Sequence, residues 1–102
     1  MSQTEDTGKV ITYFLRLFVA GNEPNSKCAR ENLGIICDEH FRGSFQIEEI
    51  DVLKDFEAAL KDRIFVTPAV IRVVPVPRVV IFGQLSDKQR VLSALLGDDH
   101  GT

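Results

Sequence analysis

The sequence predicts an α/β domain in which a four-stranded mixed sheet carries three helices, in the order β-α-β-α-β-β-α. Apolar residues follow strand-like spacing in four segments and helix-like spacing in three, and these segments alternate along the chain. The 102 residues form one compact domain and leave no room for a second. A β-α-β unit followed by a hairpin and a closing helix indicates a mixed sheet with helices on both faces.

The first strand and the first helix are predicted from residues 10–40. Residues 10–19 (VITYFLRLFV) are β-branched, aromatic and nearly all apolar, which is typical of a strand covered on both faces. Glycine and asparagine suit the turn that follows, and Asn22 is the expected N-cap. Pro24 suits the first turn of a helix over residues 24–40. The expected buried stripe of this helix is Ala29, Leu33, Ile36 and Cys37.

The middle of the chain is predicted to form a strand and a short helix. Residues 45–53 alternate loosely between apolar and polar, which predicts a strand that carries a bulge or lies at a sheet edge. A second helix is predicted over residues 54–63. Its expected buried stripe is Phe56, Ala59 and Leu60, at positions i, i+3 and i+4.

The last part of the chain is predicted to form a hairpin and a third helix. Strands over residues 64–74 and 78–83 are separated only by a Pro-Val-Pro link, so they are expected to pair antiparallel. Ser86 is the expected N-cap of the helix, with Gln89 completing a capping box. The expected apolar stripe and terminating glycine are Val91, Leu92, Leu95, Leu96 and Gly97.

This order of elements is the thioredoxin-like arrangement. Redox-active members carry a Cys-x-x-Cys pair where the first strand meets the first helix, so that the helix N-terminus stabilises a thiolate. Here residues 22–25 (NEPN) contain no cysteine, and Cys28 and Cys37 are predicted to face opposite sides of one helix. A thiol- or glutathione-dependent protein using Cys28 is therefore the less favoured alternative. Thr67-Pro68 lies where this fold carries a cis proline, although a trans proline could also begin the strand.

Composition excludes several classes of protein. The chain has 12 basic and 15 acidic residues, and this net charge of -3 argues against a nucleic-acid partner. No apolar run approaches the roughly 20 residues that span a bilayer, so a cytoplasmic protein without a membrane partner is expected. The sequence contains no metal-ligand cluster, phosphate loop or hydrolase motif, so we expect a protein without a cofactor and without enzymatic activity. Residues 1–9 are predicted to be a disordered leader, residues 10–97 the domain, and residues 98–102 a loose acidic tail.

Four sequence blocks resemble those of the KaiB family. They fall in the same order and at nearly the same spacing over about residues 10–96. The blocks are residues 20–26 (AGNEPNS), residues 50–54 (IDVLK), residues 62–64 (DRI) leading to Thr67-Pro68, and residues 83–87 (GQLSD).

The resemblance implies a non-enzymatic partner of KaiC, a RecA-like ATPase ring with autokinase and autophosphatase activities. In this family the thioredoxin-like form docks on the first ATPase ring of KaiC and then sequesters KaiA, as part of circadian timing. Members outside cyanobacteria often lack KaiA and are associated with timing or stress adaptation. Carried over by position, Arg63 falls where the family has a lysine in its KaiC contact region. Lys54, Asp55 and the second helix would form the rest of that surface.

Two further expectations follow from the resemblance. The amino-terminal domain of the KaiC-binding histidine kinase docks on the same ring, so a sensor-type module acting in trans is a third interpretation. Cyanobacterial members also adopt a second, tetrameric fold with a rearranged C-terminal half.

The last helix of this chain departs from the cyanobacterial pattern. Where those members read Ile-Gly-Leu-Asp-Leu-Leu, this chain has residues 93–98 (SALLGD). Ala94 in place of glycine favours helix by roughly 0.8 to 1 kcal/mol, and Leu96 in place of aspartate is expected to complete the buried stripe. Thr67 and Pro68 are the other residues expected to determine the fold. The thioredoxin-like form is therefore expected to predominate. Exposed strand edges could also pair copies of this chain, so the sequence leaves a homo-oligomer as an open alternative.

Overall fold

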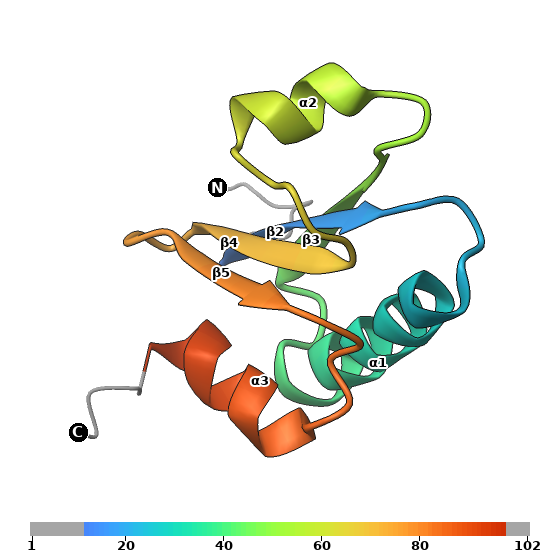
Figure 1. Ribbon diagram of the computed structural model, residues 1–102. Coiled ribbons are helices and arrows are strands. Elements are labelled where there is room, and N and C mark those ends of the chain that lie inside the picture. Colours follow the sequence, from blue (N-terminus) through green and yellow to red (C-terminus); the bar gives the residue numbers. More distant parts are fainter. Residues whose placement is uncertain (1–11, 98–102) are drawn as a thin grey trace.

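The computed structural model describes residues 12–97 and confirms the predicted sheet and helices (Figure 1). The strand order is β3-β2-β4-β5; β2 pairs parallel with β3 and antiparallel with β4, and β5 pairs antiparallel with β4. Helices α1 and α3 cover one face, and α2 lies on the other. The elements are β2 (Tyr13–Val19), α1 (Pro24–His40), β3 (Phe45–Asp51), α2 (Phe56–Lys61), β4 (Ala69–Val74), β5 (Val79–Phe82) and α3 (Lys88–Leu96).

Several predicted boundaries move. Helix α2 has only six residues, because a cap ends it on each side. Strand β4 begins only at Ala69, because the preceding Pro68 has no N–H to donate to the sheet. Strand β3 is an edge strand with continuous register against β2, so the edge interpretation is right and the bulge is wrong. The register shift lies instead between Phe14 and Leu15 in the β2–β4 pair. The predicted leader and tail lie outside the described residues.

The main core lies between the sheet and helices α1 and α3. All four residues of the predicted α1 stripe are buried, and they pack against the inward side chains of β2 and against α3. Both faces of β2 are covered, as its continuous apolar sequence predicts. The buried residues of this core include Leu15, Leu17, Val19, Ala29, Leu33, Ile36, Cys37, Val91 and Leu95.

The helix caps differ in detail from those predicted. Glu23, rather than Asn22, caps α1, and its side chain accepts a hydrogen bond from the N–H of Ser26. Asp87, rather than Ser86, caps α3, because Asp87 stands directly before the first helical residue. Gly97 ends α3 in the left-handed conformation with φ +78°, as predicted.

Three apolar positions predicted to be buried are exposed. Leu96 is 43% exposed, because it faces away from the side of α3 on which Val91 and Leu95 are buried. On α2, Ala59 is buried, whereas Phe56 and Leu60 are exposed. A helix this short packs little more than one residue onto the sheet.

Strand β4 carries a buried arginine that the sequence did not single out. Arg72 is 3% exposed, and its guanidinium donates from Nη1 to the carbonyl of Leu95 at 2.8 Å and from Nη2 to the carbonyl of Pro77 at 2.7 Å. Its Nε has no hydrogen-bond partner within residues 12–97. A cation at the last turn of a helix is stabilised by the helix dipole. Arg72 thus ties the end of α3 and the hairpin turn to the sheet.

None of the helices in the described part of the chain is long and apolar enough to cross a membrane.

Candidate functional site

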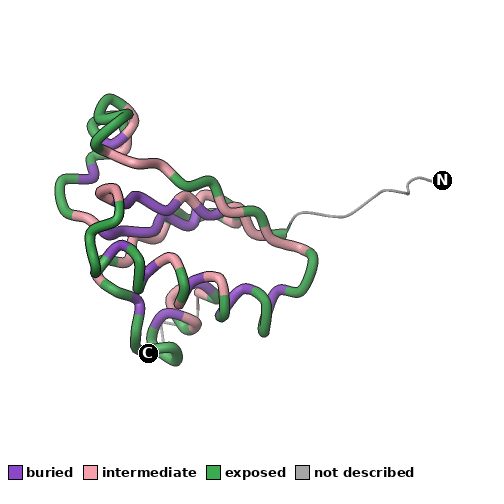
Figure 2. The backbone as a smooth tube through the Cα atoms, turned by 90° about the vertical axis from the view of Figure 1, so that its right-hand side faces the viewer, coloured by how far each residue is buried: buried purple, intermediate pink, exposed green. Residues whose placement is uncertain are grey.

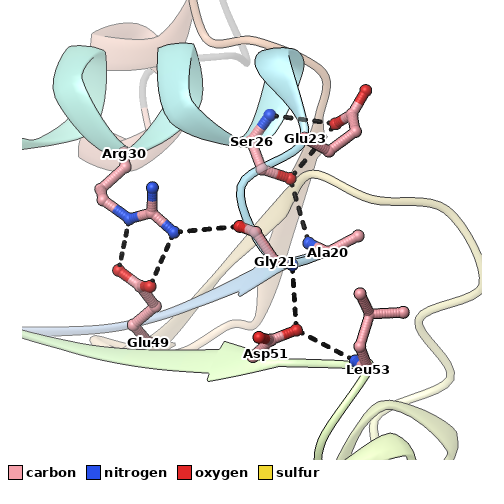
Figure 3. A network of polar contacts seen from close by, with 8 residues as sticks. All are labelled: Ala20, Gly21, Glu23, Ser26, Arg30, Glu49, Asp51 and Leu53. Carbon is pink, nitrogen blue, oxygen red and sulfur yellow. Dashed lines mark hydrogen bonds and ion pairs between the residues drawn. The ribbon is translucent and has the colours of Figure 1, made fainter.

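The carboxyl ends of the parallel strands β2 and β3 meet at one corner of the molecule, where a polar network holds the loop over residues 20–26 (Figure 3). Asp51 Oδ1 accepts hydrogen bonds from the N–H groups of Gly21 and Leu53, both at 3.0 Å. These two bonds, first that from Gly21, hold the pKa of Asp51 below its ordinary value. Gly21 has φ +55°, and an added Cβ would lie 3.3 Å from Leu53 Cδ1, so this turn requires glycine.

The same loop is fixed to α1 and β3 by side chains. The buried Ser26 hydroxyl accepts from the N–H of Ala20 at 3.0 Å and lies 3.4 Å from Glu23 Oε1. Arg30 forms a two-point ion pair with Glu49, with both N–O distances 2.9 Å. Two of the sequence blocks therefore build one rigid corner that supports the chain leading into α2.

Lys54 and Asp55 stand together in the turn before α2, and both are exposed. Their N–H groups donate to the carbonyl of Asp51, each at 2.9 Å. Asp55 is also the N-cap of α2, and its Oδ1 accepts from the N–H of Ala58 at 3.2 Å. Asp55, one of the predicted partner-binding residues, therefore has a structural role as the cap of α2.

Arg63 lies just beyond the other end of α2, a six-residue helix about 9 Å long. The N–H of Arg63 donates to Leu60 at 3.0 Å, and the N–H of Ile64 donates to Ala59 at 2.8 Å, which is the Schellman pattern of helix termination. Arg63 has φ +60°, a left-handed conformation that favours glycine. The side chain of Arg63 is thus exposed, and its backbone is strained.

The end of α2 is anchored to the sheet through Asp62. The Asp62 carboxylate accepts from Arg16 Nη1 at 3.0 Å, and Arg16 Nε lies 2.9 Å from Glu48 Oε1. Arg78 donates to the backbone carbonyl of Asp62 at 2.6 Å. These contacts fix the position of Arg63 relative to the sheet.

An exposed apolar surface surrounds α2, and here we call it the α2 patch. Its members lie on the turn before α2, on the helix and on the loop after it, and several line a hollow of about 360 Å³ with the buried Ala59 and Ile64 at its base. Helical periodicity did not predict this surface, although the chain from Leu53 to Val66 holds more large apolar residues than a short helix can bury. The patch and its exposed fractions are Leu53 74%, Phe56 61%, Leu60 47%, Phe65 75% and Val66 60%.

Charges of both signs surround the α2 patch. All five side chains of this rim are exposed, and the acidic ones stand at the start of α2. The basic residues Lys61 and Arg63 stand at its end, and Lys54 precedes the helix. The rim consists of Lys54, Asp55, Glu57, Lys61 and Arg63.

The two cysteines have different environments. Cys37 is completely buried, and burial raises the pKa of its thiol to about 12, so it is protonated at neutral pH. Cys28 is exposed on the same helix. The Thr67-Pro68 bond is cis, which is one of the two states that the sequence left open. Within residues 12–97, no group of three or more His, Cys, Asp or Glu side chains is placed to hold a metal ion.

The four residues expected to determine the fold lie in different environments. Pro68 is buried, Thr67 and Ala94 are half-buried, and Leu96 is exposed. Leu96 therefore contributes less apolar burial to α3 than the sequence predicts.

Comparison with known proteins identifies the family. The sequence model of the KaiB domain matches residues 16–96. This chain belongs to the KaiB family. It is 45% identical over 84 residues to the circadian clock oscillator protein KaiB of Prochlorococcus marinus (strain MIT 9303), covering 82% of this chain and 71% of that protein. It is also 45% identical over 84 residues to the KaiB of Microcystis aeruginosa, covering 82% and 81% of the two chains.

Solved structures support the thioredoxin-like fold of this KaiB-family chain. The N-terminal domain of Synechococcus elongatus SasA matches with a TM-score of 0.69 at 23% identity, over 96% of this chain and 95% of that one. Mitochondrial thioredoxin 3 from Saccharomyces cerevisiae matches with a TM-score of 0.69 at 11% identity, over 85% and 79% of the two chains. At these identities the likeness shows the fold alone.

Proposed function

We propose that this KaiB-family protein is a non-enzymatic regulator that docks on the ring of a KaiC-like RecA-type ATPase, in circadian or stress-related timing. The observation that carries the proposal is the α2 patch, because a contiguous exposed apolar surface with a charged rim is typical of a protein interface. The names of the relatives, circadian clock oscillator proteins, support the class of process. Where the host has a KaiA protein, the docked form is proposed to bind it.

The shape of the site favours specific docking. The apolar centre supplies contact area, and Arg63 at its border supplies a cation of the kind enriched at binding hot spots. Both ends of α2 are capped, and Asp62 is bonded to Arg16 and Arg78. A surface that is already ordered loses little conformational entropy when a partner binds.

The thiol-dependent alternative has less support. Thiol exchange needs an accessible thiolate and usually a second thiol beside it. The chain has two cysteines, and one of them, Cys37, is buried and protonated. Cys28 stands alone on the exposed side of α1.

We also propose that the free protein keeps the thioredoxin-like fold, with α3 helical. Asp87 caps the start of α3, Gly97 ends it, and Arg72 bonds its last turn to the sheet. Ala94 adds helix propensity over glycine. The test is the NMR secondary chemical shifts of residues 88–96 in the free protein. Helical shifts are expected, and a C-terminal strand in a tetramer would overturn this proposal.

The test of docking mixes the purified protein with the KaiC-like ATPase of the same organism and ATP, followed by size exclusion with light scattering. The expected result is a co-eluting ring complex that Arg63→Glu weakens. Arg42→Glu is the matched control, because Arg42 is also exposed but lies before β3, at the opposite end of that strand from the α2 patch. Absence of a complex in every nucleotide state would contradict the proposed function.

A further inference from the structure

Strand β5 is the last strand in the sheet order, and α3 runs beside it (Figure 1). A groove of about 500 Å³ is formed by β5, the loop after it and α3. Its apolar lining includes Val80, Phe82, Leu85, Val91 and Ala94, none of which belongs to the α2 patch. We propose that this groove binds an extended, acidic peptide segment of a partner protein, which adds to the sheet as a strand beside β5. This inference does not rest on the proposed function.

The backbone of β5 directs hydrogen-bonding groups toward the outer edge of the sheet. The N–H of Gly83 donates to the carbonyl of Pro68 at 2.9 Å, so these residues form a hydrogen-bonded pair that continues the β4–β5 ladder. Hydrogen-bonded and non-hydrogen-bonded pairs alternate along an antiparallel ladder. The N–H and C=O of Ile81 therefore face β4, whereas those of Val80 and Phe82 face outward. In the described part of the chain no strand lies beyond β5, so these outward groups are available to an added strand.

The side chains of β5 favour pairing with another strand. The strand has the sequence Val-Val-Ile-Phe, with no charged residue to hinder the approach of a second strand. Phe82 is 56% exposed beside the groove, and a side chain of an added strand would cover it as a cross-strand pair. Side chains alternate between the two faces of a strand. The bound segment is therefore expected to carry apolar residues at alternate positions.

The charges around β5 favour an acidic segment. Arg78 precedes the strand, Arg90 lines the groove, and Arg72 lies on the paired strand β4. None of these three arginines forms an ion pair with a carboxylate within residues 12–97. The groove lining also contains Asp87, whose carboxylate caps α3. The surroundings of β5 are therefore net positive, which attracts a segment that carries Asp or Glu.

The first test selects peptides on the immobilised full chain from a displayed library of random sequences. Enriched peptides should carry apolar residues at alternate positions, at least one Asp or Glu, and no internal proline. Selection on the Phe82→Pro chain should not enrich these peptides, because proline removes the outward N–H of residue 82. Absence of enrichment on the wild type, or enrichment of basic or proline-rich peptides, would overturn the proposal.

A synthetic copy of an enriched peptide then tests the strand pairing. Phe82→Pro should weaken its binding by about ten-fold, which corresponds to about 1.4 kcal/mol. Phe82→Ala is the matched control, because it keeps the N–H, and it should weaken binding less. In the wild type the peptide should slow hydrogen exchange at the amides of Val80 and Phe82 and leave that of Ile81, which already faces β4, unchanged. Unchanged exchange at Val80 and Phe82 in the peptide complex would overturn strand addition, and so would equal binding by Phe82→Pro and the wild type.

A charge test checks the acidic character of the segment. Arg90→Glu should weaken binding of the same peptide by about five-fold, which corresponds to about 1 kcal/mol. Lys88→Glu is the matched control, because Lys88 is also exposed on α3 but lies 3.2 Å from a carboxylate oxygen of Glu39, outside the groove. A copy of the peptide with lysine in place of its acidic residue should bind Arg90→Glu better than the wild type. Equal binding of the acidic peptide to Arg90→Glu and to the wild type would overturn the choice of an acidic segment.

Ring docking gives an independent readout. Phe56→Glu changes the α2 patch and should bind the peptide like the wild type, whereas Arg90→Glu should dock on the ring like the wild type. Loss of peptide binding in Phe56→Glu would place the peptide on the α2 patch and overturn the groove. A chain that binds the peptide but never the ring would contradict the proposed function and leave the groove standing. A chain that binds the ring but no peptide would overturn the groove and leave the proposed function standing.

Discussion

The two faces of the sheet differ in how completely helices cover them. On one face α1 and α3, with 17 and nine residues, form a cluster of 12 buried residues with the strands and loops of the described chain. On the other face the six-residue α2 contributes to a cluster of five buried residues in the described part of the chain and leaves its own Phe56 and Leu60 exposed. In Figure 2 the tube of α2 is mostly in the colour of exposed residues. The closed face therefore buries most of the core, and the open face leaves exposed the apolar surface that we propose as the docking site.

The largest expected effect contrasts one apolar residue from each face. Leu33→Ala removes a completely buried side chain of α1 and should lower the free energy of unfolding by about 3 to 4 kcal/mol, from lost burial and a cavity. Phe56→Ala removes a larger side chain that is 61% exposed and should cost less than about 1 kcal/mol. Urea unfolding of both variants measures the difference. Equal losses would show that α2 belongs to the main core, contrary to the separation of the two faces.

The next effect concerns the arginine that holds α3 to the closed face. Arg72→Met should cost about 2 kcal/mol, because the carbonyls of Leu95 and Pro77 lose charged donors. Hydrogen exchange of the α3 amides should speed up more than exchange in β2. Arg78→Met is the matched control, since Arg78 is exposed and makes one bond to a backbone carbonyl, and it should cost less than about 1 kcal/mol. Unchanged α3 exchange in Arg72→Met would contradict the role of Arg72.

A smaller effect separates binding from stability on the open face. Arg63→Gly relieves the left-handed backbone at φ +60° and should raise the free energy of unfolding by about 0.5 to 1 kcal/mol, while it weakens docking on the ring. Arg63→Ala removes the same guanidinium but keeps the strain, so it should lose docking without gaining stability. Thermal unfolding and the co-elution assay give both readouts. A glycine variant that docks as well as the wild type would exclude Arg63 from the interface.

The smallest effect concerns the loop that supports the open face. The pKa of Asp51 is lowered in the folded protein by the N–H groups of Gly21 and Leu53, so its contribution to stability is present above the unfolded pKa of about 3.9. That contribution is lost as pH falls through the lower folded value. Asp51→Asn keeps an acceptor oxygen without the charge, so the difference in urea midpoint between the two proteins should shrink as pH falls from 5 to about 3. A difference in urea midpoint that stays constant from pH 5 to about 3 would contradict the stabilising role of the Asp51 carboxylate.

Local sequence predicted the elements of the closed face well. Pro24, the apolar spacing of Ala29, Leu33, Ile36 and Cys37, and a terminating Gly97 are all local signals, and the structure places them as expected. Arg72 could not be predicted to be buried, because its two acceptors come from other segments, the hairpin turn and the end of α3. The exposure of Leu96 likewise depends on which side of α3 meets the sheet.

The open face was predicted only in part. The resemblance to the KaiB family indicated Lys54, Asp55 and Arg63, and the structure places them at the two ends of α2. The apolar stripe of Phe56 and Leu60 predicted burial, because periodicity records which residues share a helix face and not whether anything covers that face. The length of α2 decides this, and that length follows from the Asp55 cap and the left-handed Arg63.

Hydrogen-exchange mass spectrometry of the free chain and of its mixture with the KaiC-like ATPase and ATP tests most directly whether the open face is the docking surface. The backbone amides of residues 53–66, which carry the α2 patch and its rim, should exchange more slowly in the mixture, and those on the outer side of α1 should not change. Protection confined to α1 or to the outer edge of β3, with residues 53–66 unchanged, would contradict the assignment of the docking surface to α2.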